Sequence, residues 1–220
     1  MLDIVYQDAY LMIINKPRGL IVHEGSGVKT RTLEDELALI QKDTTLERQG
    51  LVHRLDKNTA GLMIVAKDAK TQELLSAMLK KHDVERTYLG IVEGVMHGKG
   101  TIDKNIMRSP RNRTLYITTQ SKQGRNAVTH YSVVGNYKKY TLVRFNLETG
   151  RTHQIRVHCK SIGRPLVGDP EYNPKSTIAR GVGQMLESVE IAFTHPITNK
   201  PIKVKIQTTD LFKSIQSKMT

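Results

Sequence analysis

The stretch LVHRLDKNTAGLMIVAKD, residues 51–68, contains the elements that decide the predicted fold. Residues 61–66 form a continuous apolar run, which indicates a buried β-strand. Asp68 follows this run and can cap a helix over residues 69–82, where apolar side chains recur with helical spacing. Asp56 precedes the strand, and no other acidic residue separates it from Asp68. The stretch therefore predicts a strand, a helix and one isolated carboxylate at a sheet edge.

The segments on the N-terminal side of this stretch also have clear local patterns. Residues 4–22 hold two short apolar strands, which are punctuated by Asp8 and by the turn sequence KPRG at residues 16–19. Thr32 can cap a helix over residues 33–41, because its first turn is acidic and its apolar residues share a face.

The C-terminal side is predicted to be mostly strands. Residues 87–94 and 140–148 alternate between apolar and polar side chains, as half-buried strands do. Residues 113–120 and 127–135 flank the basic segment SKQGR, residues 121–125, and are predicted to form a hairpin around it.

Residues 153–159, HQIRVHC, also alternate and are predicted to form a strand. Its polar face would carry Gln154, Arg156 and His158. No linker, repeat or low-complexity tract interrupts the chain. Strand-rich hairpins with two helices predict one α+β domain over residues 1–220, built on a largely antiparallel or mixed sheet.

The composition is that of an ordinary globular protein, with 38% hydrophobic and 25% charged residues. No apolar run approaches the roughly 20 residues of a membrane helix, and the N-terminus lacks the basic region of a signal peptide. The single cysteine, Cys159, excludes an intrachain disulfide and suits a reducing cytoplasm. A cytoplasmic protein without a membrane partner is expected.

The charge is concentrated in one part of the chain. The net charge is +13, and residues 101–160 carry 12 basic residues against two acidic ones, Asp103 and Glu148. Such a concentration predicts a polyanionic partner, above all a nucleic acid. The alternative is a basic face that only keeps the protein soluble.

Two other kinds of site are disfavoured by spacing. Residues 23–30, HEGSGVKT, lack the first glycine of a phosphate-binding loop, and a valine separates the last glycine from the lysine. His153 and His158 would point to opposite faces of the expected strand, so they would not converge on a metal ion. No metal site is expected, and a metal-dependent nuclease would need clustered carboxylates that the sequence lacks.

Asp56 has two interpretations. It can cap a polar turn, because DKNTAG is a turn-rich sequence. Alternatively, a partly desolvated aspartate at a sheet edge needs a cation to remain charged, and Arg54, Arg151 and Arg156 are candidates. An aspartate held ionised in this way is a poor general acid but a competent nucleophile. His53, on the expected strand, would point away from Arg54 and is a structural candidate.

Seven blocks in order give the sequence a close resemblance to a known family. They are NKPRGLIVHEG, LVHRLDKNTAGLMIVAKD, TYLGIVEG, PRNRT, GRNAVTHYSVV, LETGRTHQIRVHCKSIGRPLVGDPEY and FTHPIT. The blocks lie between residues 15 and 198, and the chain resembles the RluA family of RNA pseudouridine synthases over essentially residues 3–206. The resemblance implies the family's fold, a central mixed, mostly antiparallel sheet flanked by helices and loops. It also implies isomerisation of uridine to pseudouridine in RNA, with no cofactor and no metal.

The resemblance also implies catalytic roles for individual residues. Asp56 matches the family's essential aspartate, and Arg156 matches the arginine that pairs with it. Tyr88 matches the active-site tyrosine, which can stack on the base and accept the proton from carbon 5. Arg54 matches an arginine that displaces or replaces the flipped-out nucleotide, since a stacked base must leave the helix before its glycosidic bond can be reached.

The remaining candidates are RNA-binding residues, and they coincide with the concentrated positive charge. They are Arg111, Arg113, Lys122, Arg125 and Arg151. The expected partner is structured RNA, a stem-loop of large-subunit ribosomal RNA, of transfer RNA or of both, bound by a monomer without an additional N-terminal RNA-binding module. The sequence departs from the family at Leu186-Glu187-Ser188, where Leu-His-Ala is common, which bears on substrate subgroup only. A catalytically idle RNA-binding or assembly factor on the same fold is the alternative function.

Overall fold

The computed structural model describes residues 2–23, 30–42 and 45–219. The chain divides into two compact units, and each contains a run of hydrogen-bonded strands. Unit 1 comprises Met1–Arg86 and Ser188–Ile206, and unit 2 comprises Thr87–Glu187 and Gln207–Thr220. The chain passes between the units three times, within β4 (Glu85–Glu93), within β10 (Leu186–Thr194) and between Ile206 and Gln207. The assignment of residues 1–220 to one catalytic domain stays a prediction.

The sheet of unit 1 is built around the apolar strand predicted from residues 61–66. The strands are β1 (Asp3–Gln7), β2 (Leu11–Lys16), β3 (Ala60–Ala66), β10 and β11 (Pro201–Lys205). They follow the order β1-β2-β3-β10, and β11 pairs with β10 in antiparallel fashion. Every residue of β3 is buried, so the continuous apolar run does indicate an interior strand.

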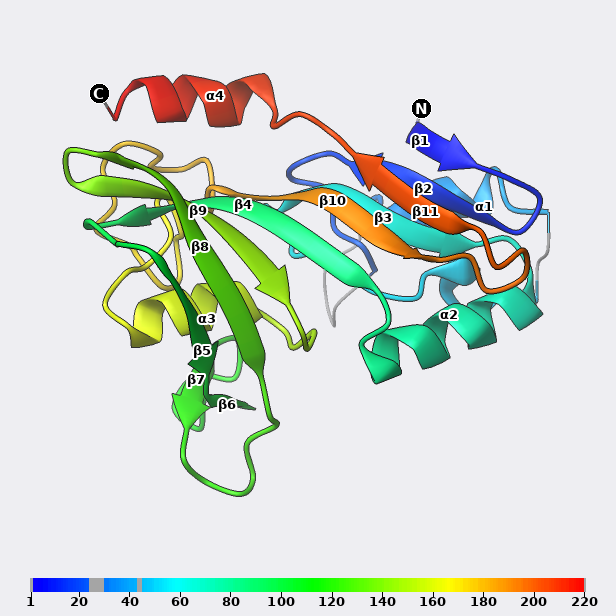
Figure 1. Cartoon of the computed structure of the whole chain (residues 1–220), viewed down its shortest axis with the longest axis horizontal. Helices are drawn as coiled ribbons and strands as arrows, with labels where there is room; N and C mark the ends of the chain where they lie inside the picture. Colours follow the sequence, from blue (N-terminus) through cyan, green and yellow to red (C-terminus); the bar gives the residue numbers. More distant parts are fainter. Residues whose placement is uncertain (1, 24–29, 43–44, 220) are drawn as a thin grey trace. The chain divides into compact units, whose positions relative to one another are not determined.

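Two helices of unit 1 begin where their capping residues predict. Thr32 and Asp35 form a capping box at the start of α1 (Leu33–Ala38), which is shorter than the predicted 33–41. Asp68 caps α2 (Ala69–Lys81) by accepting the Thr71 N–H. Leu75 of α2 is buried in the apolar core that includes β3 (Figure 1). A short 3₁₀ segment, η1 (Glu47–Gly50), lies between the two helices in the chain.

The sheet of unit 2 has the strand order β4-β9-β8-β5. Its further members are β5 (Lys99–Asp103), β8 (Val128–Tyr137) and β9 (Tyr140–Leu147). Two short strands, β6 (Asn105–Arg108) and β7 (Tyr116–Thr119), form a separate antiparallel pair. Helices α3 (Gln154–Ser161) and α4 (Asp210–Ser217) complete the unit (Figure 1). The α+β class with a mixed sheet flanked by helices is confirmed.

The predicted hairpin around residues 121–125 is wrong. The strands on its two sides form, but β7 pairs with β6, whereas β8 pairs with β5 and β9. Arg125, at the end of the segment, forms a backbone bridge with Ile106 instead. Alternation along a strand indicates which face is buried, but it does not identify the strand's partner.

The predicted strand over residues 153–159 is also wrong, because this segment forms α3. His153 precedes the helix with left-handed dihedral angles, φ 57° and ψ 18°, and its carbonyl accepts the Val157 N–H. The alternation in the sequence does not correspond to alternating exposure, because Gln154, Arg156 and His158 are buried together with their apolar neighbours. Each of these polar side chains has hydrogen-bond partners inside unit 2, so burial on all sides is tolerated.

None of the helices in the described part of the chain has the length and apolar character that crossing a membrane requires.

Candidate active site

Asp56 lies in a loop of unit 1, and the side chain of Lys16, the first residue of the KPRG turn, binds the backbone of this loop. The loop runs between Leu51, which bridges to Val65, and the start of β3. The Lys16 ammonium donates to the carbonyl oxygens of Pro17 at 2.9 Å, Leu20 at 2.9 Å and Lys57 at 3.2 Å. Because Lys57 directly follows Asp56, the hydrogen bond from Lys16 to the Lys57 carbonyl holds the backbone beside the Asp56 carboxylate in place.

Lys16 is fully buried, and its electrostatic surroundings include Asp56. Burial lowers the pKa of Lys16 to about 8, the charge of Arg18 acts in the same direction, and the charge of Asp56 opposes both. A cation therefore accompanies Asp56 within unit 1 itself. Lys16 was not predicted to be part of the site, although the sequence shows a lysine at the end of an otherwise apolar strand.

Replacement of Lys16 by Met is expected to lower the free energy of unfolding by about 2–4 kcal/mol at neutral pH. Methionine fills a similar volume but leaves the three carbonyl oxygens without the ammonium that they now share. Urea unfolding of both proteins measures the loss. Lys57→Met is the matched control, since the Lys57 side chain is exposed and its carbonyl is unchanged.

The same two proteins provide a pH test of that prediction. The pKa of Lys16 is about 8 in the folded protein and near 10.5 in the unfolded chain, so the unfolded chain binds more protons between these values. Wild-type stability should therefore rise relative to Lys16→Met by about 2 kcal/mol between roughly pH 7.5 and 9.5. A difference that stays constant over this pH range would contradict the lowered pKa of Lys16 in the folded protein.

His53 is a structural residue rather than a base for Asp56. Its Nε2 accepts the backbone N–H of Ile64 at 2.9 Å, which joins the loop to β3. Burial lowers the pKa of His53 to about 3, and the charge of Arg86 contributes further. The ring is therefore neutral at physiological pH, and the structural interpretation of His53 agrees with its position.

Arg54 is exposed and contacts a histidine from the preceding part of unit 1. Its Nη1 lies 3.0 Å from Nε2 of His23. Burial lowers the pKa of His23, and the charges of Arg54 and Arg48 lower it further. A neutral His23 can accept a hydrogen bond from Arg54, so the guanidinium is held at the surface where an RNA strand could reach it.

In unit 2, Arg156 of α3 is buried between two carboxylates. Its Nε lies 2.7 Å from Asp169 Oδ2, and its Nη2 lies 2.8 Å from Asp169 Oδ1 and 2.6 Å from Glu171 Oε2. The ring of Tyr172 lies 5.0 Å from the guanidinium carbon. Arg156 was predicted to lie on a strand, and its contacts with Asp169, Glu171 and Tyr172 were not predicted.

Tyr88 lies in β4 of unit 2, where it is 5% exposed and pairs across the sheet with Phe145 of β9. Cys159 is buried in α3, and burial raises the pKa of its thiol, with the charge of Asp169 adding to the effect. The thiol is therefore not available as a nucleophile. Across the described residues, no group of three or more His, Cys, Asp or Glu side chains is placed to hold a metal ion.

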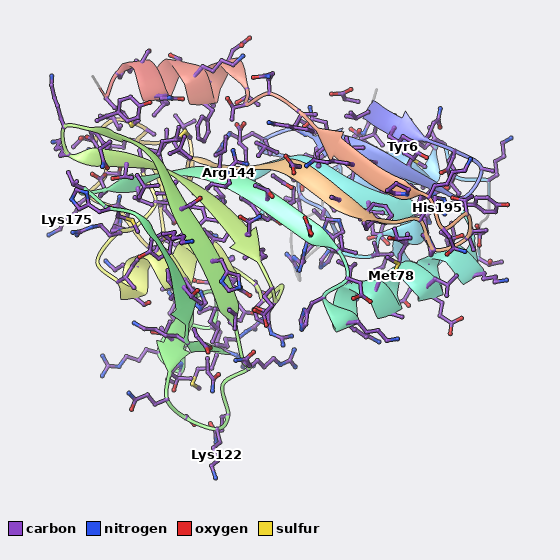
Figure 2. All side chains as sticks on the ribbon, viewed as in Figure 1. Tyr6, Met78, Lys122, Arg144, Lys175 and His195 are labelled. Atoms are coloured by element: carbon purple, nitrogen blue, oxygen red, sulfur yellow. The ribbon has the colours of Figure 1, made fainter. Side chains whose placement is uncertain are left out.

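The predicted RNA-binding residues lie in the loops of unit 2. Arg111 and Arg113 are exposed between β6 and β7, and Lys122 and Arg125 are exposed between β7 and β8. Figure 2 shows the Lys122 side chain extending away from the tip of its loop. Arg151 donates from Nε to the Asn126 carbonyl at 2.9 Å, so it supports the end of that loop. These two loops expose four basic side chains to solvent, and Arg151 supports the loop that carries Lys122 and Arg125.

Comparisons with known proteins agree on one family. A family model described as RNA pseudouridylate synthase matches residues 10–161. The chain is 43% identical over 207 residues to the "Uncharacterized RNA pseudouridine synthase YlyB" of Bacillus subtilis, covering 92% of the chain and 67% of that protein. It is 41% identical over 215 residues to the "Ribosomal large subunit pseudouridine synthase D" of Vibrio cholerae, covering 92% and 66%. The chain thus spans about two-thirds of the length of these relatives.

Among solved structures, the fold is similar to "Human RNA Pseudouridylate Synthase Domain Containing 4", with a TM-score of 0.78 and 24% identity. That match covers 99% of this chain and 92% of the human one. At this level of identity the likeness establishes the fold alone.

Proposed function

Because the chain belongs to the RNA pseudouridylate synthase family, a family of isomerases, we propose that it converts uridines of large-subunit ribosomal RNA to pseudouridine. The observation that carries the proposal is the family match over residues 10–161, which includes Asp56 in its lysine-supported loop. The names of the relatives favour ribosomal RNA as the target. A stem-loop of transfer RNA is the alternative target. The protein is proposed to act in the cytoplasm as a monomer.

The reaction needs one ionised carboxylate and no other reagent. The bond between uracil nitrogen 1 and ribose carbon 1 breaks, and a bond between carbon 5 and the same ribose carbon forms. The proton on carbon 5 leaves, and nitrogen 1 gains one, so atoms and electrons balance. Asp56 is the proposed catalytic carboxylate. It can attack carbon 6 of uracil, attack carbon 1 of ribose or remove a proton from carbon 2 of ribose, and all three routes remain open.

Two further residues are proposed to complete the site. Arg156 supplies a buried cation as partner of the Asp56 carboxylate, and Tyr88 supplies a phenol to contact the base. Hydrolysis of a glycosidic bond ordinarily uses two carboxylates, one as acid and one as base or nucleophile. A single carboxylate is consistent with an isomerisation in which the departing base is retained and rejoined.

The direct test uses RNA that carries uridine tritiated at carbon 5. Purified protein is incubated separately with large-subunit ribosomal RNA and with transfer RNA, and the released tritium is counted. Release from ribosomal RNA is expected. Release from transfer RNA alone would move the target, and binding to either RNA without release would favour the idle RNA-binding factor. Adding a chelator should leave the rate of tritium release unchanged, whereas a chelator would abolish the activity of a metal-dependent nuclease.

Replacement of Lys122 and Arg125 by Ala is expected to weaken RNA binding and flatten its dependence on salt. Each lost phosphate contact removes about 0.7 from the slope of log K against log salt for single strands. The double variant should therefore lower the slope by about 1.4 when both residues contact phosphates. Filter binding across a salt series measures this. Lys175→Ala is the control, because Lys175 is exposed in unit 2 but far along the chain from this loop. An unchanged slope would remove the loop from the interface.

A further inference from the structure

The loop GDPEY, residues 168–172, surrounds Arg156 in unit 2. Asp169 is fully buried and meets both Nε and Nη2 of the guanidinium, at 2.7 Å and 2.8 Å. Glu171, whose side chain is 34% exposed, meets Nη2 at 2.6 Å. Glu171 contacts Nη2 alone, whereas Asp169 makes a two-point contact along the edge of the planar guanidinium that Nε and Nη2 form. A two-point contact of this kind sets the plane and the direction of the group as well as its position.

Asp169 is itself held in a defined orientation. Its Oδ1 accepts the backbone N–H groups of Glu171 and Tyr172, both at 3.0 Å. Gly168 has φ +73°, and a Cβ there would lie 2.6 Å from the Gly183 carbonyl oxygen, so only glycine allows this loop to close as it does. The Gly168 N–H donates to Ser176 Oγ at 2.9 Å. The carboxylate that orients Arg156 is thus part of a rigid turn.

Tyr172 fixes the other face of the arrangement. Its ring lies 5.0 Å from the Arg156 guanidinium carbon, within range of a cation–π contact. Its phenol oxygen accepts the Tyr116 N–H at 2.9 Å and lies 2.9 Å from Nδ1 of His153, the residue before α3. The ring is therefore tied to β7 and to the start of the helix that carries Arg156.

Two carboxylates, those of Asp169 and Glu171, contact the one buried guanidinium of Arg156. One buried arginine with two carboxylates leaves a net negative charge, and well-packed apolar residues often stabilise a core as well as a buried ion pair does. An arginine whose direction matters for chemistry needs this kind of support, since a misplacement of about 1 Å can cost about a hundredfold in rate.

We propose that Asp169, assisted by Glu171, is a positioning residue that aims the Arg156 guanidinium for the isomerisation of uridine. This inference rests on the proposed function. Asp169 does not touch RNA in this proposal; it acts through the orientation that it gives to Arg156.

The test compares Asp169→Asn with Ser176→Ala by single-turnover and steady-state kinetics on tritiated ribosomal RNA. Asparagine places an NH₂ group against Nε–H or Nη2–H, so the two-point contact is lost. We expect kcat to fall about a hundredfold, with KM and the Kd for RNA within about twofold of wild type. Ser176→Ala removes one hydrogen bond of the loop but keeps both contacts of Asp169 with Arg156, so it should leave kcat within about threefold of wild type.

Several outcomes would overturn the inference, and they are distinguishable. If wild-type protein releases no tritium, the proposed function fails and the inference with it. If wild type is active but Asp169→Asn keeps kcat, raises KM instead, or loses no more than Ser176→Ala, only the positioning role fails. Should Asp169→Asn not fold, Glu171→Gln decides, because Glu171 is partly exposed. It should lower kcat about fivefold to tenfold with unchanged KM, and an unchanged kcat would overturn the role.

Discussion

Asp56→Asn is expected to remain folded and bind RNA but to lose turnover by a factor of at least about 10⁴. Asparagine has the shape of aspartate but cannot be ionised, so it can neither attack the uridine nor remove a proton from it. The fold should tolerate the change, because Asp56 is only half-buried and Lys16 binds backbone carbonyls whether or not the carboxylate is charged. Chemistry and binding are thereby separated in one variant.

The measurement is tritium release under single-turnover conditions, with RNA affinity measured in parallel by filter binding. Asp83→Asn is the matched control, since it makes the same chemical change at an exposed position after α2 in unit 1. The control should turn over at the wild-type rate. Turnover by Asp56→Asn above about one-hundredth of wild type would mean that Asp56 is not the reacting carboxylate. A loss of RNA affinity as large as the loss of rate would assign Asp56 to binding.

The parts of unit 1 near Asp56 were predictable because their signals are local. A continuous apolar run is enough to identify a buried strand, and β3 is buried along its whole length. Asp68 and Thr32 mark helix starts, because each caps the helix that follows it in sequence. The predicted C-terminal ends differ, by three residues for α1 and by one for α2, and helix boundaries are commonly uncertain by one or two residues.

The misread parts of unit 2 depend on partners that are distant in sequence. In α3, the polar residues look like the solvent face of a strand, but Gln154 bonds the Val128 carbonyl and His158 lies 2.9 Å from Thr129 Oγ1. Burial of a polar side chain depends on whether a partner is present, and the partner here is β8, more than twenty residues earlier. The partner of β7 was misread for a different reason: β6 precedes β7 about as closely as β8 follows it, and alternation does not show which neighbour pairs with it.

Asp56 and Arg156 are predicted site residues, whereas the contacts that hold them in the structure were not predicted. Asp56 and Arg156 stand out in the sequence because of the motifs around them. Their supports use contacts that leave little trace in sequence: Lys16 binds backbone carbonyls, which any residue provides, and Asp169 lies 13 residues beyond Arg156 in an irregular loop. An unexplained charge in an apolar or turn segment is the signal that would have identified both.

Arg156→Ala is expected to have the second-largest effect, and it should act on stability and on rate together. Removing the guanidinium leaves the fully buried Asp169 carboxylate without its cation, which should cost about 3–5 kcal/mol of unfolding free energy. Loss of the oriented cation should lower kcat about a thousandfold. Urea unfolding and tritium release measure the two effects on the same preparation.

The double variant Arg156→Ala with Asp169→Ala separates these two contributions. Removing the stranded carboxylate should recover about 2 kcal/mol of the lost stability, since the buried charge is gone. The rate should not recover at all, because no residue then supplies the cation. If kcat rises together with stability, the rate loss in Arg156→Ala came from a disturbed fold, and Arg156 has no part in the chemistry. If stability recovers and kcat stays low, the buried ion pair exists to hold a catalytic cation rather than to stabilise the protein.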